Sequence, residues 1–401
     1  MKMDGAAPFL PEEIIRNILK RLPVKSLTRF RCVCKDWKNL FKSPSFIADH
    51  LHHSNRQNPS LLFQPYREGQ YISQLYVLDR GMQVRELPSV PLFGASRFRV
   101  VGSSYGLLCV EIDVQGIYPP PLLLFNPATR DVIKLPRTVD DFKCECYLGF
   151  GFSPIVNDYK IVRTYAEPKD CIYRVEVYSL STGSWDDDEY YQMQMPGAIF
   201  FADAITANGS MFWIGLQLDL DTDEDETDLD MDGEKTRVIF SFDIASEEFD
   251  CVPIPALGNN SLYQLMVYED KLAILSHVKD AELSCMFDLW VMEEHMDASD
   301  RKRRSWTKIF SSTCSAVGYW VPSIFWRGEL VYNVCELPGL VGETKCEAEN
   351  GLSTAFMLLN ISTGEVKIFK TRSCGDRRAR IFNYEESLVP VGKIPIKEPS
   401  S

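Results

Sequence analysis

The hydrophobic positions near the start of the chain follow the spacing of helices. Between residues 10 and 23, the steps between apolar residues match one face of a single helix, formed by Ile14, Ile15, Ile18, Leu19 and Leu22. Pro23 ends this helix, and further apolar residues at helical spacing predict two or three short helices up to residue 53. About 45 residues cannot bury all of this surface within themselves. The remaining apolar face therefore packs either on the rest of the chain or on another protein.

From residue 61 onward the helical spacing disappears. Short runs of β-branched and aromatic residues alternate with turn residues, which predicts an all-β region. Two units recur along it. One is a pair of apolar strands around a tight turn, as in 100–111 and 203–215; the other is a strand, a turn and a second strand, as in 122–136 and 238–255.

The spacing of these units predicts a β-propeller. Turns of the second unit fall near residues 79, 126, 180, 243, 292 and 360, and the longer intervals contain inserts, so the repeat is about 47–50 residues or four strands. Six repeats predict six blades; a two-sheet sandwich is the alternative. The last pair, 379–391, has no following strands, whereas 61–88 holds the complementary half. We therefore expect both ends of this region to share one blade and close the ring.

Charge divides the chain into two parts. The net charge is −13, and residues 1–53 hold ten basic and five acidic residues, which leaves −18 for the remainder. An acidic body argues against a nucleic-acid binder, which needs a basic surface. Ten of the acidic residues lie in an insert at 219–234. Asp228, Asp230, Asp232 and Gly233 match the opening of a calcium loop, but Ile239 at the twelfth position cannot bind the ion. The segment therefore predicts a solvated, disordered insert, with a calcium site as the alternative.

The sequence contains no motif of a catalytic, cofactor-binding or metal-binding site. GxSxG, HExxH and phosphate-binding loops are missing, and the chain has five histidines. The twelve cysteines include CxC pairs rather than CxxC pairs, so we expect free, mostly buried thiols. No apolar run is long enough to span a membrane, and the start lacks the features of a secretory signal. We therefore expect a protein of the cytoplasm, the nucleus or both, with no membrane partner.

Residues 10–40, LPEEIIRNILKRLPVKSLTRFRCVCKDWKNL, resemble an F-box. The match lies in Leu10-Pro11-x-Glu13, Arg21-Leu22-Pro23 and the run from Arg29 to Trp37. The resemblance implies docking onto the Skp-type adaptor of a Skp–cullin–F-box ubiquitin ligase, abbreviated SCF. By position, the residues that would face this adaptor or shape that face are Leu10, Pro11, Ile15, Ile18, Leu19, Leu22, Pro23, Val24, Leu27, Val33, Cys34 and Trp37.

Most of residues 100–390 resemble the F-box-associated domains of plant F-box proteins. The matching segments include GLLC (106–109), FNPATR (125–130), GFGF (149–152) and NDYKIVR (157–163). The resemblance implies a kelch-like propeller that binds substrates. Within this group, GFGFSPIVNDYKIVR and FDLWVME are similar to S-locus F-box proteins of pollen, which recognise ribonucleases in self-incompatibility.

These features together predict a small all-α F-box module followed by an all-β propeller. The expected boundaries are 1–53 for the F-box, 54–60 for a linker, 61–393 for the propeller and 394–401 for a tail. The predicted function is that of a non-catalytic subunit of an SCF-type E3 ubiquitin ligase. It would join a protein substrate to the adaptor, and through it to the cullin–RING ligase, for ubiquitination and degradation. A basic substrate would suit the acidic insert. The alternatives are an interaction adaptor that does not drive degradation, and a propeller enzyme such as a glycosidase.

Overall fold

The computed structural model describes most of the chain from residue 10 to residue 391. Residues outside the description are 1–9, 58–59, 68–69, 72, 80, 92–96, 139–144, 167–170, 188–190, 192–193, 219–234, 258–261, 280–284, 297–301, 315–321, 335–352, 375–377 and 392–401. Both the predicted disorder and the alternative calcium site of the acidic insert therefore lie outside the described residues.

Four helices form the N-terminal module: α1 (Glu12–Leu19), α2 (Val24–Phe30), α3 (Lys35–Leu40) and α4 (Pro44–Gln57). Pro11 and Pro23 precede the first two helices, where a fixed φ and a missing N–H cost nothing. Arg16 of α1 pairs with Asp49 of α4 at 2.8 Å. Because α4 continues to Gln57 and the first strand begins at Ser60, most of the predicted linker is helix.

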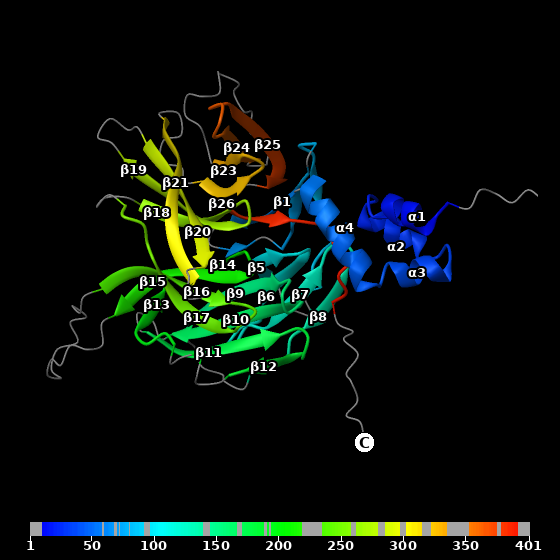
Figure 1. Cartoon of the computed structure of the whole chain (residues 1–401), viewed down its shortest axis with the longest axis horizontal. Coiled ribbons are helices and arrows are strands. Elements are labelled where there is room, and N and C mark those ends of the chain that lie inside the picture. The colour runs from blue at the N-terminus through cyan, green and yellow to red at the C-terminus, as the bar shows by residue number, and fades with distance from the viewer. Residues whose placement is uncertain are drawn as a thin grey trace, which may run out of the picture.

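The strands of the described residues form six antiparallel sheets arranged as blades around a central axis (Figure 1). The first blade holds β26 (Arg378–Tyr384), β1 (Ser60–Arg67), β3 (Tyr76–Leu78) and β4 (Val84–Glu86), with β2 (Gln70–Tyr71) beside β1. The second holds β5 (Arg97–Ser104), β6 (Leu107–Asp113), β7 (Leu122–Asn126) and β8 (Asp131–Lys134). The third holds β9 (Glu145–Ser153), β10 (Asp158–Ala166), β11 (Ile172–Ser179) and β12 (Ser184–Asp186). The fourth holds β13 (Ala198–Phe200), β14 (Ile205–Ala207), β15 (Ser210–Leu218), β16 (Lys235–Asp243) and β17 (Glu248–Pro253). The fifth holds β18 (Leu262–Tyr268), β19 (Lys271–Lys279), β20 (Cys285–Met296) and β21 (Lys302–Cys314). The sixth holds β22 (Pro322–Trp326), β23 (Glu329–Val334), β24 (Ser353–Asn360) and β25 (Val366–Cys374).

The ring closes within the first blade, as the sequence predicts. The innermost strands contact one another in the order β26, β5, β9, β14, β18, β22 and back to β26. Strand β26 pairs with β1 from Ser60 opposite Tyr384 to Tyr66 opposite Arg378. One detail of the prediction is wrong: residues 379–391 supply one strand rather than two, because the chain leaves the sheet after Tyr384 and β1 provides the second strand.

The two ends of the propeller differ. In four of the inner hairpins, both turn residues have positive φ, as at Asn208-Gly209 and Arg327-Gly328, which matches the twist of paired strands. Because successive strands are antiparallel, these turns and the turns between third and fourth strands lie at one end, called here the turn end. The other connections lie at the opposite loop end. The helical module packs on the turn end, where Ala128 contacts its core.

Residues Glu385–Val391, called here the strap, run from β26 across the turn end. The buried side-chain amide of Asn126 donates to the carbonyls of Ser387 and Val389 at 3.0 and 2.8 Å. Gly106 has a φ of 81°, and a Cβ there would lie 2.1 Å from Ser387. Leu388 then enters the core of the helical module. The helical module and the propeller therefore share one hydrophobic core.

That shared core contains the most buried apolar side chains of the helices. Its buried members are Leu19, Val24, Leu27, Phe41, Phe46 and Leu388.

The cysteines differ from the expectation of mostly buried thiols. Among the cysteines whose side chains the structure describes, Cys32, Cys34 and Cys251 are exposed, and only Cys109 is fully buried.

Candidate functional site

The apolar face predicted for the first helix is divided in two. Ile15 and Leu19 point toward the helical core, whereas Ile14 and Ile18 are 45% and 49% exposed. Residues four apart lie in one row along a helix, and these two rows are next to each other. One row is therefore used by the module's own core, and the other is left outside it.

The structure separates the predicted adaptor-facing residues into three groups. Exposed are Leu10, Pro11, Ile18, Pro23, Val33 and Cys34; partly buried are Ile15, Leu22 and Trp37; buried are Leu19, Val24 and Leu27. The buried group supports the surface from beneath and is not accessible to a partner. Ile14 is not among the predicted adaptor-facing residues, but it is exposed and belongs with the exposed group. Its spacing of four residues from Ile18 places both in the same exposed row of the helix.

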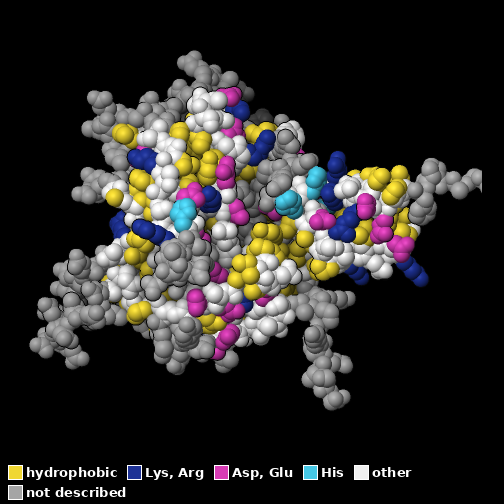
Figure 2. Space-filling model, viewed as in Figure 1, with side chains coloured by type: hydrophobic (Ala, Val, Ile, Leu, Met, Phe, Trp, Pro, Cys, Tyr) yellow, Lys and Arg dark blue, Asp and Glu magenta, His cyan; other side chains and the backbone are white. Residues whose placement is uncertain are grey.

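The exposed apolar residues Leu10, Ile14, Ile18 and Val33 are called here the outer face. They lie on the part of the helical module that projects from the propeller, where hydrophobic side chains gather (Figure 2). A group of exposed large apolar side chains on so small a module is typical of a protein-binding surface. The propeller does not cover this face. The apolar surface left over by the helices could pack on the rest of the chain or on another protein, and the exposed outer face favours another protein.

An ionic cluster joins four innermost segments inside the ring. The Asp203 carboxylate, between β13 and β14, accepts hydrogen bonds from Leu148 N at 3.0 Å, from Arg380 at 2.9 Å and from Arg99. Arg99 also binds Glu111 at 2.8 Å. Burial by itself would lower the pKa of the Arg99 guanidinium. The negative charges of Asp203 and Glu111 outweigh this effect, so the pKa of Arg99 is raised. The cluster therefore pins β26, β5, β9 and the fourth blade together.

Exposed apolar residues lie on the innermost segments of the fourth and fifth blades, between their middle and the loop end. Phe201 follows β13 and Leu262 begins β18, and both side chains are more than half exposed. Strand β14, which follows Phe201 in the chain, and strand β18 are neighbours in the ring. Strand β15 ends and β16 begins at this same end, so the acidic insert 219–234 is attached there.

Glu385, the first residue of the strap, is an unusual carboxyl group at the turn end. Its Oε2 atom is buried, and no described residue gives it a hydrogen bond. Burial, with the nearby charge of Asp270, raises its pKa to about 7. Burial of this kind favours the neutral form of a carboxyl group, so Glu385 is mostly protonated below pH 7.

Among the described residues, no three side chains of His, Cys, Asp or Glu gather in a way that could hold a metal ion. His50 is buried, and its Nε2 lies 2.9 Å from the carbonyl of Leu22; His277 is also buried. None of the helices described is both long and apolar enough to cross a membrane.

The comparisons define the class of protein. Residues 8–49 match the F-box domain, and residues 88–333 match the F-box associated beta propeller domain. The chain therefore belongs to the F-box proteins that carry an associated β-propeller, as the sequence resemblance predicts.

Its relatives are plant F-box proteins. An F-box/kelch-repeat protein of Arabidopsis thaliana is 26% identical over 322 residues, covering 75% of this chain and 79% of the relative. The F-box protein CPR1 of the same plant is 26% identical over 329 residues, covering 75% and 72%. A putative F-box/kelch-repeat protein is 24% identical over 404 residues, covering 96% and 99%. The narrower resemblance to the S-locus group stays a prediction.

Proposed function

We propose that this protein is the substrate-recognition subunit of an SCF-type ubiquitin ligase. The outer face of the helical module docks onto a Skp-type adaptor, and the propeller holds a protein substrate. The chain supplies no chemistry of its own; it raises the local concentration of substrate near the ubiquitin-charged enzyme. We place this work in the cytoplasm or the nucleus.

One observation carries the proposal: the outer face is apolar, exposed and left uncovered by the propeller. The five excess positive charges of residues 1–53 would favour an acidic adaptor. The shared core below the outer face holds the docking helices at a fixed angle to the propeller. A substrate on the propeller would therefore be held in a defined position relative to the ligase.

The loop end is the proposed substrate-binding end. It lies opposite the helical module, so substrate and adaptor would not compete for space. Leu262 at the loop end and Phe201 nearer the middle of its blade offer exposed apolar anchors, and the buried centre of a protein interface is more apolar than its rim. The acidic insert attached at this end would attract a basic substrate at long range.

The docking half of the proposal is tested by placing a charge in the outer face. We expect Ile18→Asp to weaken binding to a purified Skp-type adaptor by at least about 100-fold, because a carboxylate would be buried without a partner. The matched control is Ile155→Asp, which changes an 84% exposed isoleucine on the propeller. Unchanged adaptor binding by a folded Ile18→Asp variant would contradict the proposed face.

The substrate half needs a separate experiment. Proximity labelling with the wild-type chain, with and without proteasome inhibition, would identify proteins that accumulate when degradation is blocked. We expect Phe201→Ser with Leu262→Ser to lose those proteins while keeping the adaptor. Ubiquitination of a captured protein in a reconstituted complex separates a ligase subunit from an adaptor that does not drive degradation. Capture without ubiquitination would favour the latter.

A further inference from the structure

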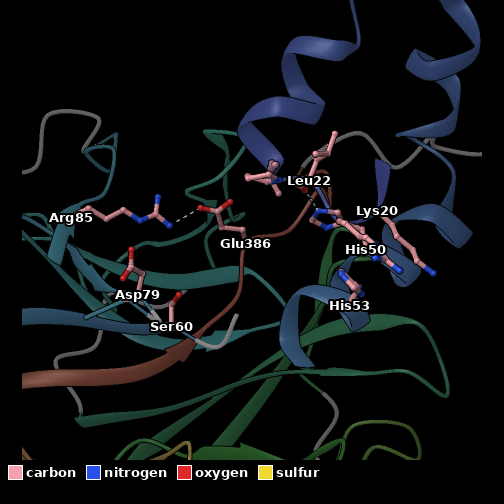
Figure 3. Close-up of a pocket in the computed structure, with 12 residues that line it drawn as sticks. Lys20, Leu22, His50, His53, Ser60, Asp79, Arg85 and Glu386 are labelled. Atoms are coloured by element: carbon pink, nitrogen blue, oxygen red, sulfur yellow. Dashed lines mark hydrogen bonds and ion pairs between the residues drawn. The ribbon is translucent and has the colours of Figure 1, made fainter. Parts of the chain in front are cut away.

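A cleft of about 440 Å³ lies between the helical module and the first blade. One wall holds Lys20, which follows α1, and His53 of α4; the opposite wall holds Ser60, Arg85 and Glu386 (Figure 3). Arg21 also lines the cleft. This volume is in the range of small-molecule sites. The cleft lies apart from the four residues of the outer face and from the loop end, although three of the predicted adaptor-facing residues, Leu22, Pro23 and Val24, also line it.

The acidic groups of the cleft already have partners. Glu386 pairs with Arg85 at 2.7 Å, and the Asp79 carboxylate accepts a hydrogen bond from Gln83 N at 2.9 Å. Neither Lys20 nor Arg21 makes an ion pair with any residue that the structure describes. Among the described residues, Lys20 and Arg21 are therefore left without an ion pair, against one carboxylate, Asp79, that also lacks a cationic partner, so the lining carries a net positive charge.

Basic residues at the end of a helix have an ordinary explanation, since the negative end of the helix dipole favours them. What distinguishes Lys20 and Arg21 is that both line a cavity. His53 responds to the same charges: burial lowers its pKa, and Arg21 and Lys20 lower it further. The positive field therefore extends across this wall of the cleft.

We propose that the cleft binds a small anion that carries one or more phosphate groups, with Lys20 and Arg21 as its ionic partners. The hydroxyl of Ser60, on the opposite wall, provides a hydrogen-bond donor. Charge-assisted hydrogen bonds from Lys and Arg are the strong contacts by which proteins hold phosphate groups. Because the two walls belong to different modules, the bound anion ties the helical module to the first blade.

The probe for this site is inorganic tripolyphosphate, added to the full-length chain and followed by calorimetry at low salt. We expect saturable binding at one site per chain. Lys20→Gln with Arg21→Gln is expected to weaken binding at least about tenfold, since it removes both ionic partners. The matched control is Lys25→Gln with Arg29→Gln, which removes the same charge from exposed positions of α2 and is expected to change binding by less than about twofold.

A second measurement distinguishes a bound anion from a diffuse attraction. An anion beside Lys20 and Arg21 offsets their field, so the pKa of His53, followed by NMR, rises on saturation with tripolyphosphate in the wild type. This rise is absent in the Lys20→Gln, Arg21→Gln variant. No saturable binding would overturn the proposal. Equal weakening by the test pair and the control pair would also overturn it, because it would show only that the basic module attracts anions.

Discussion

Replacing Glu385 by Gln tests how strongly burial acts on this carboxyl group. The folded-state pKa is about 7, against 4.5 for an ordinary glutamate. Between these two values the folded chain binds more protons than the unfolded chain, so the free energy of unfolding falls as the pH rises. The stability linked to this proton is fully present below pH 4.5 and is lost as the pH rises through 7.

The magnitude follows from the difference between the two pKa values. At pH 8 the loss reaches about 3 kcal/mol, and at pH 5 it is about 1 kcal/mol, at 1.36 kcal/mol for each pKa unit. A glutamine has nearly the same shape and cannot ionise. We therefore expect Glu385→Gln to gain about 2 kcal/mol relative to the wild type between pH 5 and pH 8.

The assay is urea unfolding of both chains at pH 5 and pH 8, followed by tryptophan fluorescence. The control is Glu386→Gln, which changes the next residue, a carboxylate paired with Arg85; it should not show a gain at high pH. If the difference between wild type and Glu385→Gln is the same at both pH values, the carboxyl is not held neutral and the reasoning about its burial is wrong.

Three further predictions concern the fold. Leu388→Ala should lower the free energy of unfolding by about 2–5 kcal/mol and weaken adaptor binding, because Leu388 fills the helical core; Val366→Ala, at a partly exposed site, should do neither when measured in the same denaturation and pull-down assays. Deletion of residues 378–401 removes β26 and should unfold the whole propeller, so a soluble product with an unchanged melting temperature would contradict the ring closure. Deletion of residues 219–234 removes ten acidic residues and should leave the melting temperature unchanged or slightly higher; a clear drop in a thermal melt would show that the insert supports the fold.

The repeat could be predicted from the sequence because its turns depend on local chemistry. The side-chain oxygen of Asn126 accepts from the backbone N–H of Ala128, and Asp243 and Asn360 accept from the residues two positions later, all at 2.9 Å. Turns of this kind need only the residue itself and its neighbours. The same turn therefore marks three blades, and its spacing reveals the period.

The helical module could be predicted only in part. Helical spacing showed that α1 has a broad apolar surface, but it could not show that Ile15 lies inward and Ile14 outward. That choice depends on how the helices pack on one another and on Leu388, which lies more than 360 residues away along the chain and joins the helical core. The raised pKa of Glu385, with Asp270 beside it, and the cleft between Lys20 and Glu386 also depend on contacts between residues distant in the sequence, and no local pattern carries them.

The pairing of β1 with β26 has a consequence for the synthesis of the protein. Strand β1 leaves the ribosome more than 300 residues before its partner, which at about 5–20 residues per second means a wait of roughly 15–60 s. Throughout this time the edge of β1 that β26 later pairs with lacks that partner, and such an edge is open to pairing with other nascent strands. Leu388 is made later still, and only then is the core of the helical module complete. A chain that ends before Leu388 therefore lacks one of the six buried side chains of the helical core.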